Sequence, residues 1–487
     1  MFELTFLGHQ GWQVTAGTTN VLLDPLLDSR FGHDPGGNGF DVFPPRQIDF
    51  DKCPPIDAVV ISHEHEDHFN VATIERLDRD IPIYFSARSS TAVCRFIREL
   101  GFDLRLATPG EVIEIGGLIV TPMAQATLSG SHPGEWDSLA LHLADRGGDG
   151  SFFTTVDHRP QARTFAQLHQ RQLRPALLSY ADNEQDHSAM FPWAAPRQDG
   201  ASSLAEELRY LFNRAMPRDY RPQGVLLCAN GYSTRGELAW MNGSIFHRDP
   251  AGAFAQVRPE LGDLFFAPKP GDVVRLQKGR RSGPAGKSEW LRSLPPTEWP
   301  AHGAGARPID PFGPATGEYR LTVEARAALA DALGEFARYL YGSTLFQEMY
   351  LLDADALGGR RGAIAIVAIE GDDAATAHDR GGEVWVWDPT GCCFVAEARS
   401  GQEQDLVAGV RCWAADLLAV LTARMPAASM TVGRMSGWNW APAQLRFELP
   451  NLIHMYCHPL RMPDAFLELY RRLRSGASPR LRARSYT

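Results

Sequence analysis

The sequence predicts an amino-terminal α/β domain followed by a second domain of the α+β class. Its 487 residues suffice for two or three domains of ordinary size. Short apolar runs alternate with segments of helical periodicity through residues 1–277, which is typical of an α/β fold. Residues 278–314 are dense in Gly, Pro, Arg and Lys, and we interpret them as a linker to residues 315–487.

The composition is that of an ordinary globular protein, with 44% hydrophobic and 22% charged residues. The formal net charge of −10 argues against general binding to nucleic acid or to an anionic membrane, because both require a basic surface. No apolar run approaches the roughly 20 residues that cross a membrane, and no secretion signal is visible. We interpret the arginine-rich segment Arg471–Arg484 as a solvated end.

The seven cysteines are scattered along the chain, and no Cys-x-x-Cys pair is present. The sequence therefore predicts neither a disulfide framework nor a zinc ribbon, and it favours a reducing compartment. We expect a cytoplasmic protein that acts on a small-molecule substrate, without nucleic-acid or membrane partners.

The elements of the first domain follow from apolar patterning. Residues 70–77, 91–100 and 203–214 have helical spacing. Gly8-His9-Gln10-Gly11 breaks the chain between the first two strands, and residues 29–50 form a Gly- and Pro-rich loop too long for a plain connector. Short apolar or alternating runs predict strands at 2–7, 12–14, 20–23, 56–61, 81–85, 104–107, 112–115, 118–122, 136–143, 151–156 and 176–180.

One predicted strand ends in a cluster of side chains that bind metals. Val59–Ile61 is apolar, and His63, His65, Asp67 and His68 follow within a few residues. Imidazole nitrogens suit zinc and iron, and a carboxylate in the same cluster permits a second ion. On a turn after a strand, alternate residues could point into one cavity while Glu64 and Glu66 point away. The other interpretation, a polar loop that is rich in histidine by chance, requires both the strand and the spacing to be accidental.

The pattern His63-x-His65-x-Asp67-His68 resembles the motif of the metallo-β-lactamase fold. The resemblance implies a four-layer αββα sandwich with two metal ions at one edge. It implies that His63 and His65 bind the first ion and that Asp67 and His68 bind the second. Asp24, in Leu22-Leu23-Asp24-Pro25, also matches the family, where this residue lies close to the metals and could orient a ligand histidine; the alternative is an Asx-turn before proline.

The resemblance implies three further ligands, one of which is missing at the expected place. A histidine is expected after Pro122-Met123-Ala124-Gln125, where this chain has Ala126. His132 could replace it if the loop folds back; otherwise the site has one protein ligand fewer or holds a single metal. Asp157, after the strand at 151–156, matches the carboxylate that bridges two metals. His187 is the candidate for the last ligand, and a helix-capping loop is its alternative.

Two later segments give a narrower resemblance. Gln223–Tyr232 and Leu264–Leu276 resemble the metallo-β-lactamase domain of CMP-N-acetylneuraminate hydroxylases and their bacterial relatives, a wider group that includes lactonase-like and phosphodiesterase-like hydrolases. The hydroxylases also carry a Rieske iron–sulfur domain, which needs Cys and His pairs that this chain lacks. If the protein oxidises a substrate, its electrons must come from a separate donor.

The second domain is predicted from helices at 319–341, 409–424 and 464–473 and strands at 363–369, 383–387, 394–396, 430–434 and 445–447. It carries two aromatic and histidine-rich stretches, Trp438-Asn439-Trp440 and His454–Pro459. These could form a substrate surface or the contact of a homodimer. Their alternative is ordinary packing in the core and at its rim.

The resemblance implies two functions, a hydrolase and an oxygenase, and the ligand set does not choose between them; the missing histidine at Ala126 leaves a third, non-enzymatic interpretation. A metal-dependent hydrolase with two divalent ions is favoured, with Asp67 and His187 as catalytic residues and zinc or iron as the cofactor. A diiron oxygenase would use the same ligands with O2 and an electron donor. A binding protein with a decayed site would explain Ala126, although such a protein would have no reason to retain His63, His65, Asp67 and His68.

Overall fold

The computed structural model describes most of the first 299 residues and a smaller share of the rest. The helix and strand expected at 464–473 and 445–447 lie outside the described residues, as do His132, His187 and Ala126. The described residues are 1–31, 40–89, 91–125, 138–182, 204–229, 232–234, 239–240, 242, 250–281, 286–299, 313–342, 364–374, 382–388, 390–397, 406, 408–425, 427–431, 434–439, 449, 452–453, 456 and 481–484.

The first large sheet contains nine strands within the described part of the chain. Its order is β19-β18-β1-β2-β3-β7-β8-β9, and β20 also pairs with β18. β1 to β3 form an antiparallel meander, whereas β3, β7, β8 and β9 are parallel. The bounds are β1 (Phe2–Gly8), β2 (Gly11–Ala16), β3 (Thr19–Leu23), β7 (Ala58–Ile61), β8 (Ile83–Ser86), β9 (Leu104–Ala107), β18 (Asp272–Gln277), β19 (Arg280–Arg281) and β20 (Gly286–Lys287).

The second large sheet has seven described strands in the order β10-β11-β12-β13-β14-β15-β17. Its first four strands are antiparallel, and β13, β14, β15 and β17 are parallel. The bounds are β10 (Ile113–Ile115), β11 (Leu118–Ala124), β12 (Leu139–Asp145), β13 (Ser151–Thr154), β14 (Leu177–Ala181), β15 (Gly224–Cys228) and β17 (Phe265–Phe266).

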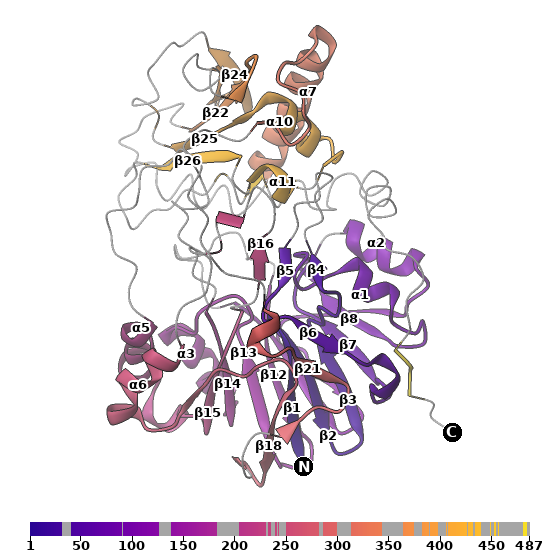
Figure 1. Ribbon diagram of the computed structural model, residues 1–487, viewed down its shortest axis with the longest axis vertical. Coiled ribbons are helices and arrows are strands. Elements are labelled where there is room, and N and C mark those ends of the chain that lie inside the picture. The colour runs from indigo at the N-terminus through magenta and orange to yellow at the C-terminus, as the bar shows by residue number, and fades with distance from the viewer. Residues whose placement is uncertain are drawn as a thin grey trace.

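The two sheets pack face to face, with helices on both outer faces. Successive strand residues point to opposite faces, so Ala58 and Val60 of β7 lie in the core between the sheets, whereas Val59 and Ile61 lie under α1 (Val71–Glu75) and α2 (Thr91–Glu99). On the other side, α3 (Ala162–Gln170), α5 (Leu204–Tyr210) and α6 (Pro250–Leu261) cover the second sheet. Figure 1 shows these helices on opposite sides of the sheets. This is the expected αββα sandwich.

Two small sheets extend the sandwich. β4 (Arg30–Phe31), β5 (Phe40–Val42) and β16 (Tyr232–Thr234) form one, and β6 (Arg46–Ile48) pairs with β21 (Leu291–Ser293) in the other. β20 and β21 belong to the stretch expected to be a linker, 278–314. That expectation is wrong for residues 286–293, because Trp290 and Leu291 are buried in the core below α1 and α2.

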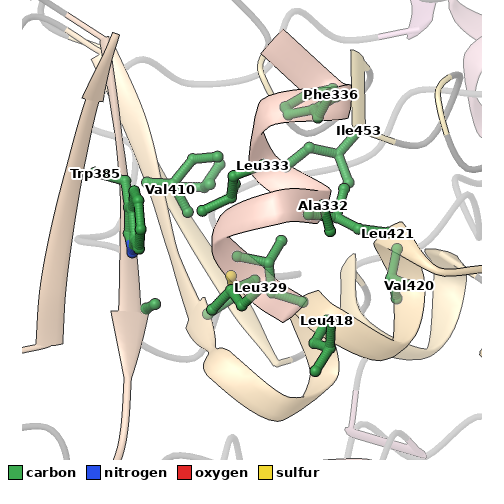
Figure 2. Close-up of a cluster of buried hydrophobic side chains, with 14 of the residues drawn as sticks. Leu329, Ala332, Leu333, Phe336, Trp385, Val410, Leu418, Val420, Leu421 and Ile453 are labelled. Carbon is green, nitrogen blue, oxygen red and sulfur yellow. The ribbon is translucent and has the colours of Figure 1, made fainter. Parts of the chain in front are cut away.

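The carboxy-terminal body is built on a five-stranded described sheet in the order β24-β23-β22-β25-β26. α7 (Val323–Gly342) and α10 (Ala414–Leu421) pack against it, and Figure 2 shows Leu329, Leu333 and Phe336 of α7 between the sheet residues Trp385 and Val410 and the α10 side chains. The strands are β22 (Ile364–Ile369), β23 (Gly382–Asp388), β24 (Cys393–Glu397), β25 (Ala408–Trp413) and β26 (Met435–Asn439); a short helix, α11 (Ala427–Thr431), precedes β26.

Two secondary-structure expectations in this body are wrong. The single helix expected at 409–424 begins instead as β25, a buried strand between β22 and β26. A buried strand is apolar on both faces, so its pattern cannot be told from that of a buried helix by periodicity. The strand expected at 430–434 lies five residues too early, because α11 occupies residues up to Thr431.

The end of the chain returns to the amino-terminal sandwich. Leu481 is 1% exposed and lies in the core below α1 and α2, and Ile56 and Leu77 form isolated bridges to Ala483 and Leu481. Arg484 Nε donates to Asp57 Oδ1 at 2.7 Å, and the Asp57 side chain is 1% exposed. The expectation of a solvated end is therefore wrong for residues 481–484. Among the described helices, none is long and apolar enough to cross a membrane.

Candidate metal centre

The candidate centre lies where strands of both large sheets end. β1, β3 and β7 run in the same direction, so the residues after Gly8, Leu23 and Ile61 meet at one edge. β13 and β15 of the second sheet end at the same edge, because the amide of Ala229, after β15, donates to the His9 carbonyl at 2.9 Å. The small sheet of β4, β5 and β16 lies at this end of the sandwich in Figure 1.

Four of these strand ends carry a residue in the left-handed region of backbone space. The φ angles are +52° at His9, +42° at Asp24, +56° at Val156 and +64° at Ala229. Such angles are uncommon for residues other than glycine and cost on the order of 1–3 kcal/mol each, least for His and Asp and most for a β-branched residue. The surrounding hydrogen bonds hold the strained turns, and the turns aim the side chains of residues 9, 24 and 157 into one region.

His63, His65 and Asp157 form the first group of ligand-type atoms. Their ligand atoms lie within 4.8 Å of one another. The His63 ring is 4.3 Å from the His65 ring between centroids, and its Nε2 atom is 3.6 Å from Asp157 Oδ2. His63 is fully buried, whereas His65 is partly exposed. The group therefore has two imidazoles and one carboxylate, with His65 on the accessible side.

His9, Asp67 and His68 form the second group, again within 4.8 Å. Asp67 Oδ2 is 2.7 Å from His9 Nε2 and 3.4 Å from His68 Nε2. The Asp67 side chain is 24% exposed, against 0% for His68 and 4% for His9, so it is the most accessible carboxylate of the two groups. His68 Nε2 is 2.9 Å from Asp157 Oδ2, so the two groups adjoin through Asp157.

Buried hydrogen bonds orient the side chains of both groups. Asp24 Oδ2 lies 3.0 Å from His68 Nδ1, and the carboxylate also accepts from the amide and hydroxyl of Ser62 at 2.7 and 2.6 Å. This contact directs Nε2 of His68 toward the two groups, as expected for an orienting role of Asp24. Gln10 Nε2 donates to Asp157 Oδ1 at 3.0 Å, which leaves Oδ2 facing His63 and His68.

The electrostatics separate the histidines into two kinds. Burial lowers the pKa of His63 well below its usual value, and the neighbouring His68 and His65 lower it further; burial also lowers the pKa of His65. For His68, burial also acts downward, but Asp157, Asp67 and Asp24 outweigh it and raise its pKa well above the usual value. Burial would raise the pKa of Asp67, yet His68 and His9 hold it well below its usual range.

The residues fit a bound divalent cation. The Nε2 atoms of His63 and His68 and the Nδ1 atom of His9 are buried, and within the described residues none of them has a hydrogen-bond partner. His68 Nε2 also lies 2.9 Å from Asp157 Oδ2, as an ion-pair contact. Buried polar atoms without partners are costly in a folded protein. Imidazole and carboxylate donors at such spacing suit zinc or iron, which would satisfy the Nε2 atoms of His63 and His68.

An aromatic cluster borders the second group. The Phe31 ring lies 5.8 Å from the His9 ring, and it contacts the rings of Phe40 and Tyr232 at 5.2 and 5.7 Å. Burial, followed by the charge of Asp67, raises the pKa of the Tyr232 phenol, so this group stays neutral. The cluster comes from β4, β5 and β16, and β4 and β5 lie within the long segment predicted as a loop at residues 29–50.

The structure brings together five of the sequence-predicted ligands: His63, His65, Asp67, His68 and Asp157. The predicted ligands His132 and His187 lie outside the described residues. Sequence reasoning missed His9 and Gln10, which it treated as a break between strands. The available signal was a pair of polar side chains, flanked by Gly8 and Gly11, directly after a buried strand.

Comparisons with known proteins agree with this architecture. Residues 19–176 match the family model described as the β-lactamase superfamily domain. A UPF0173 metal-dependent hydrolase of Halobacterium salinarum is 35% identical over 66 residues, which are 14% of this chain and 21% of that protein. The chain thus spans about a fifth of the length of the curated relatives it matches.

Solved structures with a similar chain course are distant in sequence. Isothiocyanate hydrolase from Delia radicum gut bacteria is 14% identical, with a TM-score of 0.39 over 56% of this chain and 99% of that one. CmlA, a diiron β-hydroxylase from Streptomyces venezuelae, is 16% identical, with a TM-score of 0.38 over 57% of this chain and 54% of that one. Similarities of this size do not identify a reaction or a substrate.

Proposed function

We propose that this chain, which carries a β-lactamase superfamily domain at residues 19–176, is a hydrolase that uses two divalent metal ions to act on a small-molecule substrate. The observation that carries the proposal is the pair of adjoining ligand groups at one edge of the sandwich. Each group has two histidines and one aspartate, and Asp157 reaches both. Three protein ligands with a position left open are typical of catalytic rather than structural metal sites.

The two ions would lower the pKa of a bound water and polarise a carbonyl or phosphoryl oxygen of the substrate. The side chains of this chain have separate tasks around them. Asp157, held through Oδ1 by Gln10, presents its other oxygen between the two groups. Asp67 is ionised and partly exposed, so it can accept a hydrogen bond or a proton from an attacking water. Asp24 holds the His68 ring so that its Nε2 atom faces Asp67 and Asp157.

A diiron oxygenase is the second candidate, and the composition of the groups is compatible with it as well. Two histidines and one carboxylate with open positions also form the ligand set of many non-haem iron oxygenases. Such a reaction would require an electron donor from outside this chain. The hydrolase and the oxygenase differ in the metal that the protein acquires. A third candidate, a binding protein with a decayed site, predicts no stoichiometric metal.

The test is the metal content of protein produced without metal supplement, measured by elemental analysis together with an absorption spectrum. About two zinc ions per chain, no visible absorption, and turnover of an ester, lactone or phosphodiester would support the hydrolase. About two irons with a visible band that bleaches on reduction would replace it with the oxygenase. A chain without stoichiometric metal would overturn both.

A pair of histidine variants connects metal to activity. His65→Ala removes the accessible ligand of the first group, and we expect loss of one ion and of turnover. His169→Ala, at an exposed position of α3 on the outer face, is the control and should keep both. Equal activity of the two variants would contradict a role of the first group in the reaction.

The remaining features of the proposal concern location and partners. A cytoplasmic location is supported by the six described cysteines, which are free thiols. The net charge of −10 supports a small molecule rather than nucleic acid or a membrane as partner. For the carboxy-terminal body, we propose a role in substrate or homodimer contacts, since Figure 1 places it beyond the end of the sandwich where β4, β5 and β16 lie.

A further inference from the structure

We propose that His9 is a ligand of the second metal ion, together with Asp67 and His68. The proposal rests on the two-metal function above and names a ligand that the histidine-rich motif does not contain. His9 belongs to the turn between β1 and β2, more than fifty residues before the motif in the chain, and reaches the centre only through the fold.

The backbone around His9 is built to place one side chain. The β1–β2 register changes between Phe6 and Gly8, and His9 then adopts the left-handed conformation. Its carbonyl accepts a hydrogen bond of 2.9 Å from the amide of Ala229, which connects this turn to the end of β15 in the other sheet. A strained residue fixed from both sheets has little freedom, so its ring position is a property of the fold.

The imidazole of His9 lies among the ligand atoms and lacks a complete set of partners. The residue is 3% exposed, and its Nε2 atom is 2.7 Å from Asp67 Oδ2. Its ring centroid is 5.8 Å from that of His68. If Nε2 carries the proton, the buried Nδ1 atom remains an acceptor without a donor in the described residues. If Nδ1 carries it, two lone pairs face each other across the contact with Asp67, which a shared cation would relieve.

His9 also makes the two ligand groups chemically equivalent. Without it, the second group would have, among the described residues, a single histidine and Asp67, besides the shared Asp157. With it, each ion is offered two imidazoles and one carboxylate of its own group. This is the minimum of three protein ligands found in catalytic zinc sites. The alternative is that His9 only donates a hydrogen bond to Asp67 and positions it.

Metal binding by matched variants separates these roles. His9→Gln keeps an amide that can donate to Asp67 but removes the imidazole. His142→Gln makes the same change at another buried histidine of the sandwich, outside both groups. Each protein is equilibrated with Zn²⁺, freed of excess metal and analysed for zinc per chain, and chelator competition gives the two affinities.

We expect about two ions in the unmodified chain and in His142→Gln, and one tightly bound ion in His9→Gln, with the second affinity lowered at least about 100-fold. Two ions in His9→Gln, with both affinities within about threefold of the unmodified chain, would overturn the proposal and leave His9 as a positioning residue. Fewer than two ions in the unmodified chain would instead refute the two-metal function on which it rests. If His9→Gln does not fold by circular dichroism, His9→Asn, which tolerates the left-handed backbone, gives the same comparison.

Discussion

Lowering the pH should destabilise the sandwich through His142, a buried histidine of β12 that belongs to neither ligand group. His142 lies on β12 opposite Thr121 and Phe153, and it is 4% exposed. Its Nε2 atom has no hydrogen-bond partner among the described residues, and burial lowers its pKa from 6.5 to about 4. The folded protein therefore keeps this imidazole neutral, whereas the unfolded chain protonates it near its ordinary pKa.

The sign and the magnitude follow from these two pKa values. Above about pH 6.5, His142 is neutral in both the folded and the unfolded state, so it contributes no pH dependence to the free energy of unfolding. Between about pH 6.5 and pH 4 only the unfolded state takes up the proton, and the free energy of unfolding falls. The loss from this residue is about 2 kcal/mol at pH 5 and approaches about 3 kcal/mol as the pH reaches the folded-state pKa.

The assay compares the unmodified chain with His142→Gln, which cannot titrate at this position. Both proteins are unfolded in urea at pH 7.5 and at pH 5 with chelator present. Hydrogen exchange of the β12 amides then reports how much the free energy of unfolding of the sandwich changes between the two pH values. The histidines of the metal centre titrate equally in both proteins, so they cancel in the difference. An equal loss of stability in both proteins, within about 0.5 kcal/mol, would refute the view that His142 is buried in its neutral form.

Three further predictions concern the centre and the end of the chain. Asp24→Asn should lower zinc affinity about 10- to 100-fold in chelator competition, because it weakens the contact that orients His68; an unchanged affinity would contradict this role. Zinc binding to metal-free protein at pH 7 should release about one proton from His68, whose pKa the carboxylates raise, and calorimetry in buffers of different ionisation enthalpy measures it. Leu481→Ala should destabilise the sandwich by about 2–3 kcal/mol in urea unfolding, since the side chain is 1% exposed; an effect below about 0.5 kcal/mol would mean that this end of the chain is not packed in solution.

The apolar pattern of the sequence predicted a strand of the sandwich correctly where successive residues alternate between two different faces. The strand at β7 alternates between the inner core and the helix-covered face, and its end at the motif follows from the change from apolar to ligand-type residues. Patterning failed at β25, where burial on both faces removes the period that distinguishes a strand from a helix. It also failed at residues 286–293 and 481–484, whose Gly, Pro and Arg content resembles that of linkers and solvated ends.

The sequence by itself determined the class of the first domain and the four ligand-type residues from His63 to His68, because they are neighbours in the chain. Only the tertiary structure added His9 and Gln10 from another strand, and it showed that Asp157, which the family resemblance implied, joins them. His9 and Gln10 approach because β1 and β7 run in the same direction in one sheet, and Asp157 approaches because the second sheet packs on the first. The packing of Leu481 into the core of the sandwich was likewise decided only by the tertiary structure. Contacts between residues so distant in the chain depend on strand direction and sheet packing, and no local pattern records either.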